Sequence, residues 1–167
     1  MVFLHLVIVL GAILFVFLLA WVFSAISLHK YKVRMRMKDS KDLALERAFY
    51  RFSAWYKSAT FWMIAEYAFI IVPFVSNVIV IYLTNINRDP IGAETILLHS
   101  IISLSFIVFG YAINPQRHKK CYRKAFRCLD NSINEYLSAL DSGNPNSAIL
   151  DKGTKDGEDY IDESYDI

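Results

Sequence analysis

The sequence contains little of what builds a metal site or a disulfide framework. Only two cysteines occur in 167 residues, Cys121 and Cys128, and their spacing of seven places both on one stripe of a helix. No further Cys or His stands at an interval typical of zinc ligands, so two small helix-packing residues explain the pair better than a metal site or a disulfide. We therefore assign the two cysteines no chemistry.

Motifs of enzyme active sites are also missing. The sequence has no Gly-rich loop to cradle a phosphate and no pair of His at helical metal-ligand spacing. It has no Ser or Cys at a recognisable interval from a His and an acid. The four histidines are dispersed along the chain, at His5, His29, His99 and His118. We expect a protein that is not an enzyme and that binds no cofactor and no metal.

Charged residues are nearly missing from three long apolar runs, residues 2–23, 61–83 and 95–113. A helix needs about 20 mostly apolar residues to cross the roughly 30 Å hydrocarbon core of a bilayer, and each run approaches or exceeds that length. The rest of the chain is too short for a separate catalytic domain with a large core. We predict an all-α membrane protein with three transmembrane helices.

Positive charges predict the topology of these helices. The first run carries no Lys or Arg before it, unlike a cleaved signal sequence, so we interpret residues 1–28 as an uncleaved anchor with its N-terminus outside. The positive-inside rule then places residues 30–57, and the C-terminus, in the cytoplasm. A basic collar follows the third run on the same side: Arg117, Lys119, Lys120, Arg123, Lys124 and Arg127.

The second and third runs are predicted to form a hairpin. Residues 85–94 between them are rich in turn formers, which suits a tight antiparallel connection. Before the second run, apolar residues at helical spacing predict a cytoplasmic helix over residues 39–60, with Asp39 or Ser40 as its N-cap. Because no Gly or Pro intervenes, we expect this helix to continue directly into the second span.

A second cytoplasmic helix is predicted to start at Asn114 and Pro115, since Pro is favoured at the first helical position. Apolar residues then recur in steps of four and three. They are Tyr122, Phe126, Leu129, Ile133, Tyr136 and Leu140. This stripe needs a partner, either the helix over residues 39–60 or a helix of another subunit, and we expect both contacts in a homo-oligomer.

Charge is distributed unevenly. Residues 1–140 hold sixteen Lys and Arg against eight Asp and Glu, whereas residues 141–167 hold two against eight. Topology and anionic lipid explain the basic part, so we expect the lipid bilayer as a partner and no nucleic acid. Residues 142–167 are predicted to be a disordered acidic tail after a helical segment over residues 29–141. The tail either keeps the chain soluble or docks on the basic collar, or on a partner, and restrains the protein.

Several polar residues lie within the predicted spans. Glu66 is a functional candidate because a carboxylate is costly in the bilayer, although it could also reach the interface. Pro73 is predicted to kink the second span. The remaining candidates either form ordinary interhelical hydrogen bonds or line a narrow aqueous path in an oligomer. They are Asn77, His99, Ser100 and Ser103.

The chain resembles the SLATT domain family, a two-transmembrane module with a C-terminal cytoplasmic helix. The resemblance covers roughly residues 41–140, and the extra first span departs from it. It is carried by Arg47, Ala48, Arg51, Phe52, Trp55, Asn114, Pro115, His118, Tyr122, Arg123, Glu135, Tyr136 and Leu137. It implies a membrane-disrupting effector of bacterial conflict systems, triggered by a cytosolic nucleotide-sensing or signal-generating partner.

We therefore expect a non-enzymatic, multi-pass effector in the bacterial inner, or plasma, membrane that oligomerises and forms a pore or depolarises the cell in antiviral defence. An alternative is a membrane-anchored scaffold, whose basic collar and apolar stripe recruit a cytosolic protein. A small transporter subunit or a phage-exclusion subunit would share the same topology.

Overall fold

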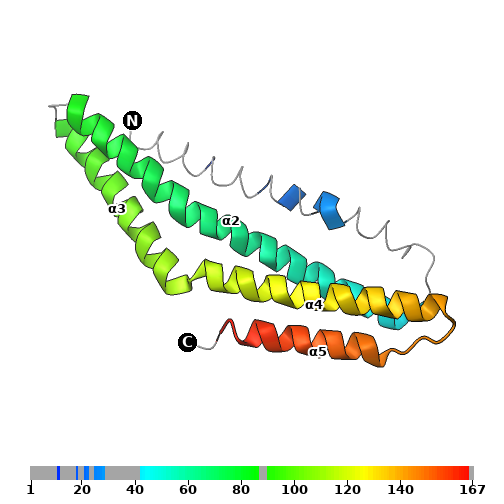
Figure 1. The fold of residues 1–167 in the computed structure, drawn as a ribbon. Helices are drawn as coiled ribbons and strands as arrows, with labels where there is room; N and C mark the ends of the chain where they lie inside the picture. The colour runs from blue at the N-terminus through cyan, green and yellow to red at the C-terminus, as the bar shows by residue number, and fades with distance from the viewer. Residues whose placement is uncertain are drawn as a thin grey trace. The chain divides into compact units, whose positions relative to one another are not determined.

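The computed structural model describes residues 42–86 and 90–165, together with Gly11, Leu18 and residues 21–22 and 25–28. Side chains are described from residue 42 to 82, at Thr84, from residue 93 to 165, and at the few residues described before residue 42. Every regular element in this part of the chain is an α-helix (Figure 1). The elements are α2 (Leu43–Ile86), α3 (Pro90–Ile113), α4 (Pro115–Asp141) and α5 (Ala148–Asp162). The predicted all-α class is confirmed for these residues.

Helix α2 runs without interruption from the predicted cytoplasmic segment into the second apolar run. Its N-cap is Asp42, whose Oδ1 accepts hydrogen bonds from the backbone N–H groups of Ala44 at 2.9 Å and Leu45 at 3.3 Å. The prediction of continuity is confirmed. The predicted caps, Asp39 and Ser40, lie outside the described residues, and α2 begins three residues after Ser40, at Leu43. The carboxylate of Asp42 thus accepts hydrogen bonds from N–H groups of the first turn, which have no acceptor within the helix.

Two described helices are long and apolar enough to cross a membrane, over Leu43–Tyr82 and Ala93–Ile113. Only 22% and 11% of their most apolar windows are buried, unlike the core helix of a soluble protein. Most of the first apolar run lies outside the described residues. The count of three spans and their orientation therefore stay predictions.

The chain divides into two compact units. The hairpin unit contains Met63–Pro115, and the bundle unit contains the described parts of Leu18–Trp62 and Gln116–Ile167. This division differs from the predicted boundaries after residues 28 and 141. The reason is that α2 supplies residues to both units, and the chain beyond residue 141 packs inside one of them.

The bundle unit has an apolar core between the first part of α2 and α4. Leu45, Ala48, Phe52 and Trp55 of α2 pack with residues of α4. Those residues are Ala125, Leu129, Ile133 and Tyr136, of which the first three are 0% exposed. Phe52 and Phe126 meet edge to face, with ring centroids 5.9 Å apart. The predicted pairing of the α4 stripe with this part of α2 is confirmed, although Leu140 is exposed.

The prediction that residues 142–167 are disordered was wrong for most of the segment, because α5 forms there and joins the bundle (Figure 1). Leu150 is buried in the core, and Tyr160 and Ile161 pack against it. The average composition of the segment concealed these apolar residues, which recur at helical spacing. The apolar surface that orders α5 is supplied by α2 and α4 rather than by the segment itself.

Candidate functional site

The two helices of the hairpin unit approach closely at one small residue. A Cβ added to Gly110 of α3 would lie 3.0 Å from Cγ of Phe69 on α2, closer than ordinary contact. The rings of Phe69 and Phe106 are 5.7 Å apart. These contacts confirm that the second and third apolar runs pack as neighbours, and they fix the register of the antiparallel pair.

Buried polar side chains of the hairpin unit form one stripe, which we call the polar seam. On α3 it consists of Thr95, His99 and Ser103, spaced four residues apart on one helix face, and on α2 of Ser76. Ser76 lies seven residues beyond Phe69, and Ser103 lies seven residues before Gly110, so the register places both at about the same level, two turns from the close approach. His99 is the most buried of the four, at 1% exposed.

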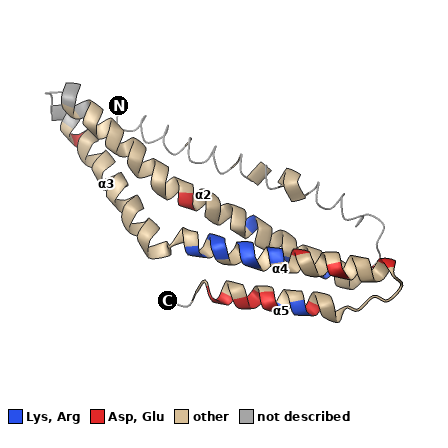
Figure 2. Cartoon of the chain, viewed as in Figure 1, with Lys and Arg blue, Asp and Glu red and all other residues tan. Residues whose placement is uncertain are grey.

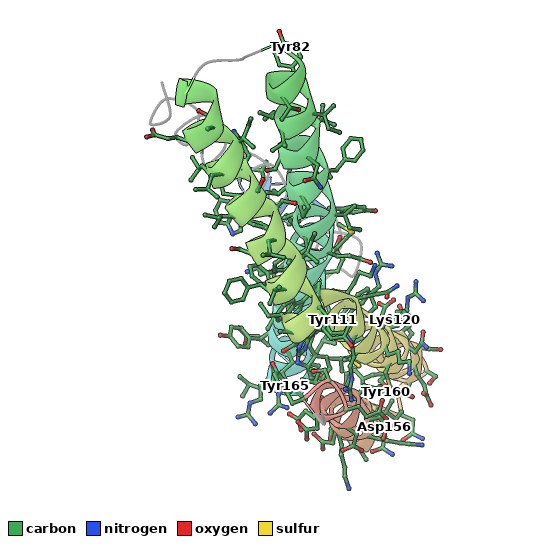
Figure 3. The ribbon with its side chains drawn as sticks, turned by 90° about the vertical axis from the view of Figure 1, so that its left-hand side faces the viewer. Tyr82, Tyr111, Lys120, Asp156, Tyr160 and Tyr165 are labelled. Atoms are coloured by element: carbon green, nitrogen blue, oxygen red, sulfur yellow. The ribbon has the colours of Figure 1, made fainter. Side chains whose placement is uncertain are left out.

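The outward surface of the same unit is apolar. Its exposed large side chains include Tyr82 and Tyr111 towards the ends of the hairpin (Figure 3). Between the ends they are mainly aliphatic. They include Ile70, Ile71, Phe74, Val75, Val78, Ile81, Leu97, Ile101, Leu104, Ile107, Val108 and Phe109. In this unit polar side chains lie inside and apolar side chains lie outside. This arrangement is the reverse of that in a water-soluble protein, and it suits a hydrocarbon environment.

The predicted intramembrane residues divide between these two faces. His99 and Ser103 belong to the polar seam, whereas Asn77 and Ser100 are exposed. The Ser100 hydroxyl donates to the carbonyl of Ile96 at 2.9 Å, so its polarity is satisfied within α3. Glu66 is half-buried in α2, and Pro73 is buried within the same helix without ending it.

Ser76 and Thr95 were not among the residues predicted from the sequence. The four-residue spacing of Thr95, His99 and Ser103 was the available signal, because it places all three on one face of α3. Hydroxyl and imidazole groups can hydrogen-bond water or coordinate a cation weakly. No group of three or more His, Cys, Asp or Glu that could hold a metal ion occurs among the residues that the structure describes.

In the bundle unit, α5 packs against α4 and α2 through two glycines. A Cβ on Gly153 would lie 2.5 Å from Cβ of Ser132, and one on Gly157 would lie 2.4 Å from Cζ3 of Trp55. Both distances are too short for any side chain. The pair Gly153 and Gly157 therefore permits α5 to lie closer to its neighbours than a larger residue would allow.

Polar contacts hold the same helix. Glu158 of α5 forms an ion pair with Arg51 of α2. The guanidinium of Arg117 on α4 donates to the carbonyl of Glu163 at 2.5 Å, and Nζ of Lys124 lies 5.2 Å from the centre of the Tyr160 ring. Figure 2 shows Lys and Arg gathered in the first half of α4, and Asp and Glu along α5.

Two tyrosine contacts of the bundle unit shift pKa values. Burial, together with the 3.2 Å hydrogen bond to the Tyr165 hydroxyl, raises the pKa of Tyr122 to about 12. The hydroxyl of Tyr136 donates to Oδ2 of Asp42. This hydrogen bond lowers the pKa of Asp42 and raises the pKa of Tyr136, because it stabilises the carboxylate and the neutral phenol together.

The two cysteines are free thiols of the bundle unit. Cys121 is buried, and Cys128 is partly buried on the side of α4 that α5 covers. Burial raises the pKa of the Cys128 thiol, and the negative charge of Asp156 adds to this effect. Such a thiol is less nucleophilic at neutral pH than an exposed one, because less of it is in the thiolate form.

Comparison with known proteins identifies no match for this chain, whether among family models, curated proteins or solved structures. The SLATT-like pattern therefore rests on the residues that suggested it. The function has to be argued from the polar seam, from the docked α5 and from the distribution of charge.

The basic collar has two sets of side chains. Arg117 and Lys119 are partly buried, whereas the other four are exposed: Lys120, Arg123, Lys124 and Arg127. Lys124 lies against α5 through the Tyr160 ring. The predicted docking of the acidic segment on the collar is met at Lys124, through the Tyr160 ring, and at Arg117, through the carbonyl of Glu163.

Proposed function

We propose that the protein is a non-enzymatic effector of the bacterial inner membrane, in which the α2 and α3 hairpin lies in the bilayer and the bundle unit lies in the cytoplasm. Subunits would associate through the hairpin and open a path for ions or water along the polar seam, which depolarises the cell. The SLATT-like pattern supports placing this activity in antiviral defence, with a cytosolic signal-generating partner as the trigger.

One observation carries the proposal: the hairpin unit buries Ser76, Thr95, His99 and Ser103 and exposes aliphatic and aromatic side chains. Two helices cannot enclose a path by themselves. In a homo-oligomer, however, rotation of the hairpins would bring the seams of several subunits to a common centre. Hydroxyl and imidazole groups would then replace part of the hydration shell of a permeating ion.

The scaffold alternative draws less support from the structure. It relied on the apolar stripe of α4 to recruit a cytosolic protein. Leu129 and Ile133 of that stripe are fully buried against α2 within the same chain. Substitutions there would remove core packing and would not discriminate recruitment from folding.

Depolarisation can be tested by inducible expression in bacteria stained with a voltage-sensitive dye. The wild-type chain is expected to collapse the membrane potential on induction. Thr95→Val, which removes a seam hydroxyl at nearly constant shape, is expected to change the rate of collapse severalfold. Thr84→Val is the matched control, because Thr84 is exposed in the same unit and its hydroxyl donates within α2, to the carbonyls of Val80 and Ile81.

The proposal fails if wild-type protein is present in the membrane fraction and the potential does not change. It also fails if both threonine variants alter the potential equally, because the effect would then not depend on the seam.

A further inference from the structure

Helix α5 is attached to α2 at two places within the bundle unit. Glu158 forms the ion pair with Arg51, and Gly157 lies so close to the ring of Trp55 that no side chain fits between them. Arg51 and Trp55 are four residues apart, so they lie on the same face of α2. Helix α5 therefore packs along this face of α2.

The same helix is attached to α4 at points along its length, and the two helices lie side by side (Figure 1). In the first part of α5, Gly153 packs against Ser132. Further along, the Tyr160 ring lies 5.2 Å from Nζ of Lys124. A backbone carbonyl just after the end of α5 accepts a hydrogen bond from Arg117. Helix α5 thus bridges α2 and α4, and a movement of one relative to the other breaks these contacts.

Opening a path along the polar seam requires α2 to move. The seam residues are buried within the hairpin unit, so they reach a common centre of an oligomer only if α2 rotates relative to α3. Helix α2 is continuous over Leu43–Ile86 and belongs to both units, so a rotation of its hairpin part also turns the face that α5 contacts. For a side chain about 5 Å from the helix axis, a rotation of roughly 30° is a displacement of about 2.5 Å, which is enough to break an ion pair.

We propose that α5 is an autoinhibitory brace. While it is docked, it holds α2 and α4 in the arrangement that keeps the polar seam closed, and its release permits the path to open. This inference rests on the proposed function, because it names the regulation of that same path. Residues 142–147 join α5 to α4, so α5 stays tethered after release and can dock again.

The docking of α5 is suited to reversible release. Gly153 and Gly157 lower the helix propensity of α5, so its order depends on packing against α2 and α4. The side chains of Arg51 and Glu158 are 48% and 50% exposed, and an ion pair as exposed as this contributes little to stability. Elements that move in a regulated protein are drawn from its less stable parts, and α5 has these properties.

The test measures the membrane potential of bacteria that express the full chain, with each variant at the same level in the membrane fraction. Gly153→Ala places a Cβ against Ser132 and is expected to speed the collapse of the potential about fivefold, because overpacking outweighs the gain in helix propensity. Ser132→Gly/Gly153→Ala removes the clash and should return the rate to that of the wild-type chain. Lys155→Ala, at an exposed residue of α5, is the control and should leave the rate unchanged.

A second pair of variants tests the contact of α5 with α2. Arg51→Glu places two negative charges next to each other and should also speed the collapse, by a fewfold. Arg51→Glu/Glu158→Arg restores opposite charges and should slow the collapse again. The double variant keeps the net charge of the chain, so recovery would identify this pair rather than charge in general.

Faster collapse in both single variants, with recovery in both double variants, supports the brace. Hydrogen exchange of the α5 amides shows whether each single variant releases α5. A variant that releases α5 but collapses the potential at the wild-type rate, or more slowly, overturns the inference and leaves the proposed path standing. Unchanged exchange in both single variants also overturns it, because these contacts would then not hold α5. If neither the wild-type chain nor any variant changes the potential, the proposed function fails and the brace fails with it.

Discussion

The substitution Gly153→Ala should release α5 from the bundle, although alanine is the better helix former. In an exposed helix, replacing Gly by Ala stabilises by about 1 kcal/mol. Here the new Cβ would lie 2.1 Å from Oγ and 2.5 Å from Cβ of Ser132. The hydroxyl can rotate away, but Cβ is fixed to the backbone of α4, so the helices must separate by about 1 Å to reach ordinary contact.

Overpacking of this kind costs about 1 to 3 kcal/mol. After the gain in helix propensity, a net loss of about 1 kcal/mol remains, which is a change of about fivefold in the equilibrium between docked and released α5. Hydrogen exchange of the α5 amides reports this equilibrium, because local opening sets their protection. We expect peptides from residues 148–162 to exchange about fivefold faster in the variant, by mass spectrometry of the full chain in detergent.

A rescue separates the clash from other effects. Ser132→Gly removes both atoms that the new Cβ would meet, and the next atom, the carbonyl oxygen of Cys128, is 3.7 Å away. The double variant Ser132→Gly/Gly153→Ala should therefore restore protection relative to Gly153→Ala. Lys155→Ala, at an exposed residue of α5, is the control and should leave exchange nearly unchanged. Unchanged or slower exchange in Gly153→Ala would refute the close packing of α5.

Three further predictions concern the bundle unit. Tyr136→Phe removes the donor to Asp42 and should cost about 1 kcal/mol in thermal or chemical unfolding. The pKa of Asp42 is lowered below 3.8 in the folded chain, so the stability that this contact supplies is present above pH 3.8. It is lost as the pH falls through the pKa of the folded chain. Tyr136→Phe should therefore weaken the dependence of stability on acid pH. The raised pKa of Tyr122 acts at alkaline pH. The stability from the contact with Tyr165 is present below pH 10 and should be lost as the pH rises towards 12. Tyr165→Phe should lower the pKa of Tyr122, which a titration of phenolate absorbance measures. Finally, Cys128 should be alkylated slowly at neutral pH in Cys121→Ser protein and faster once Gly153→Ala is added; equal rates would show that α5 does not protect the thiol.

Much of the fold could be predicted because local rules sufficed. The absence of Gly and Pro between residues 43 and 72 predicted one continuous helix, and Pro115 predicted the start of α4. The heptad spacing of Leu129 and Ile133 predicted that this face of α4 is buried, because an apolar stripe needs a partner surface. In each case the residues of a single helix were sufficient for the prediction.

The docked α5 could not be predicted from average composition. A charged, Gly-containing segment cannot order itself, and Gly153 and Gly157 lower its helix propensity further. Their value appears only when Trp55 and Ser132 lie opposite them, because the lack of a side chain then permits close contact. The stabilisation from these glycines therefore depends on residues distant in the sequence, since Trp55 lies about a hundred positions before Gly157.

The candidate site was predicted in part for a similar reason. Depth in the span selected His99 and Ser103, which are buried, but it also selected Asn77 and Ser100, which are exposed. Which face of α2 and α3 points inward is set by the register, and Phe69 and Gly110 fix that register through tertiary contact. Ser76 and Thr95 follow once the face is known.

We propose above all that the hairpin lies in lipid with its polar seam turned inward. Nitroxide side chains introduced singly at Val78 and Ile101, both exposed, and at Ser103, which is buried, allow the most direct measurement in a reconstituted bilayer. Collision with oxygen, which concentrates in hydrocarbon, is compared with collision with a water-soluble nickel complex. The account predicts frequent oxygen and rare nickel collisions at Val78 and Ile101, and few collisions of either kind at Ser103. Frequent nickel collisions at Val78 and Ile101 would contradict it.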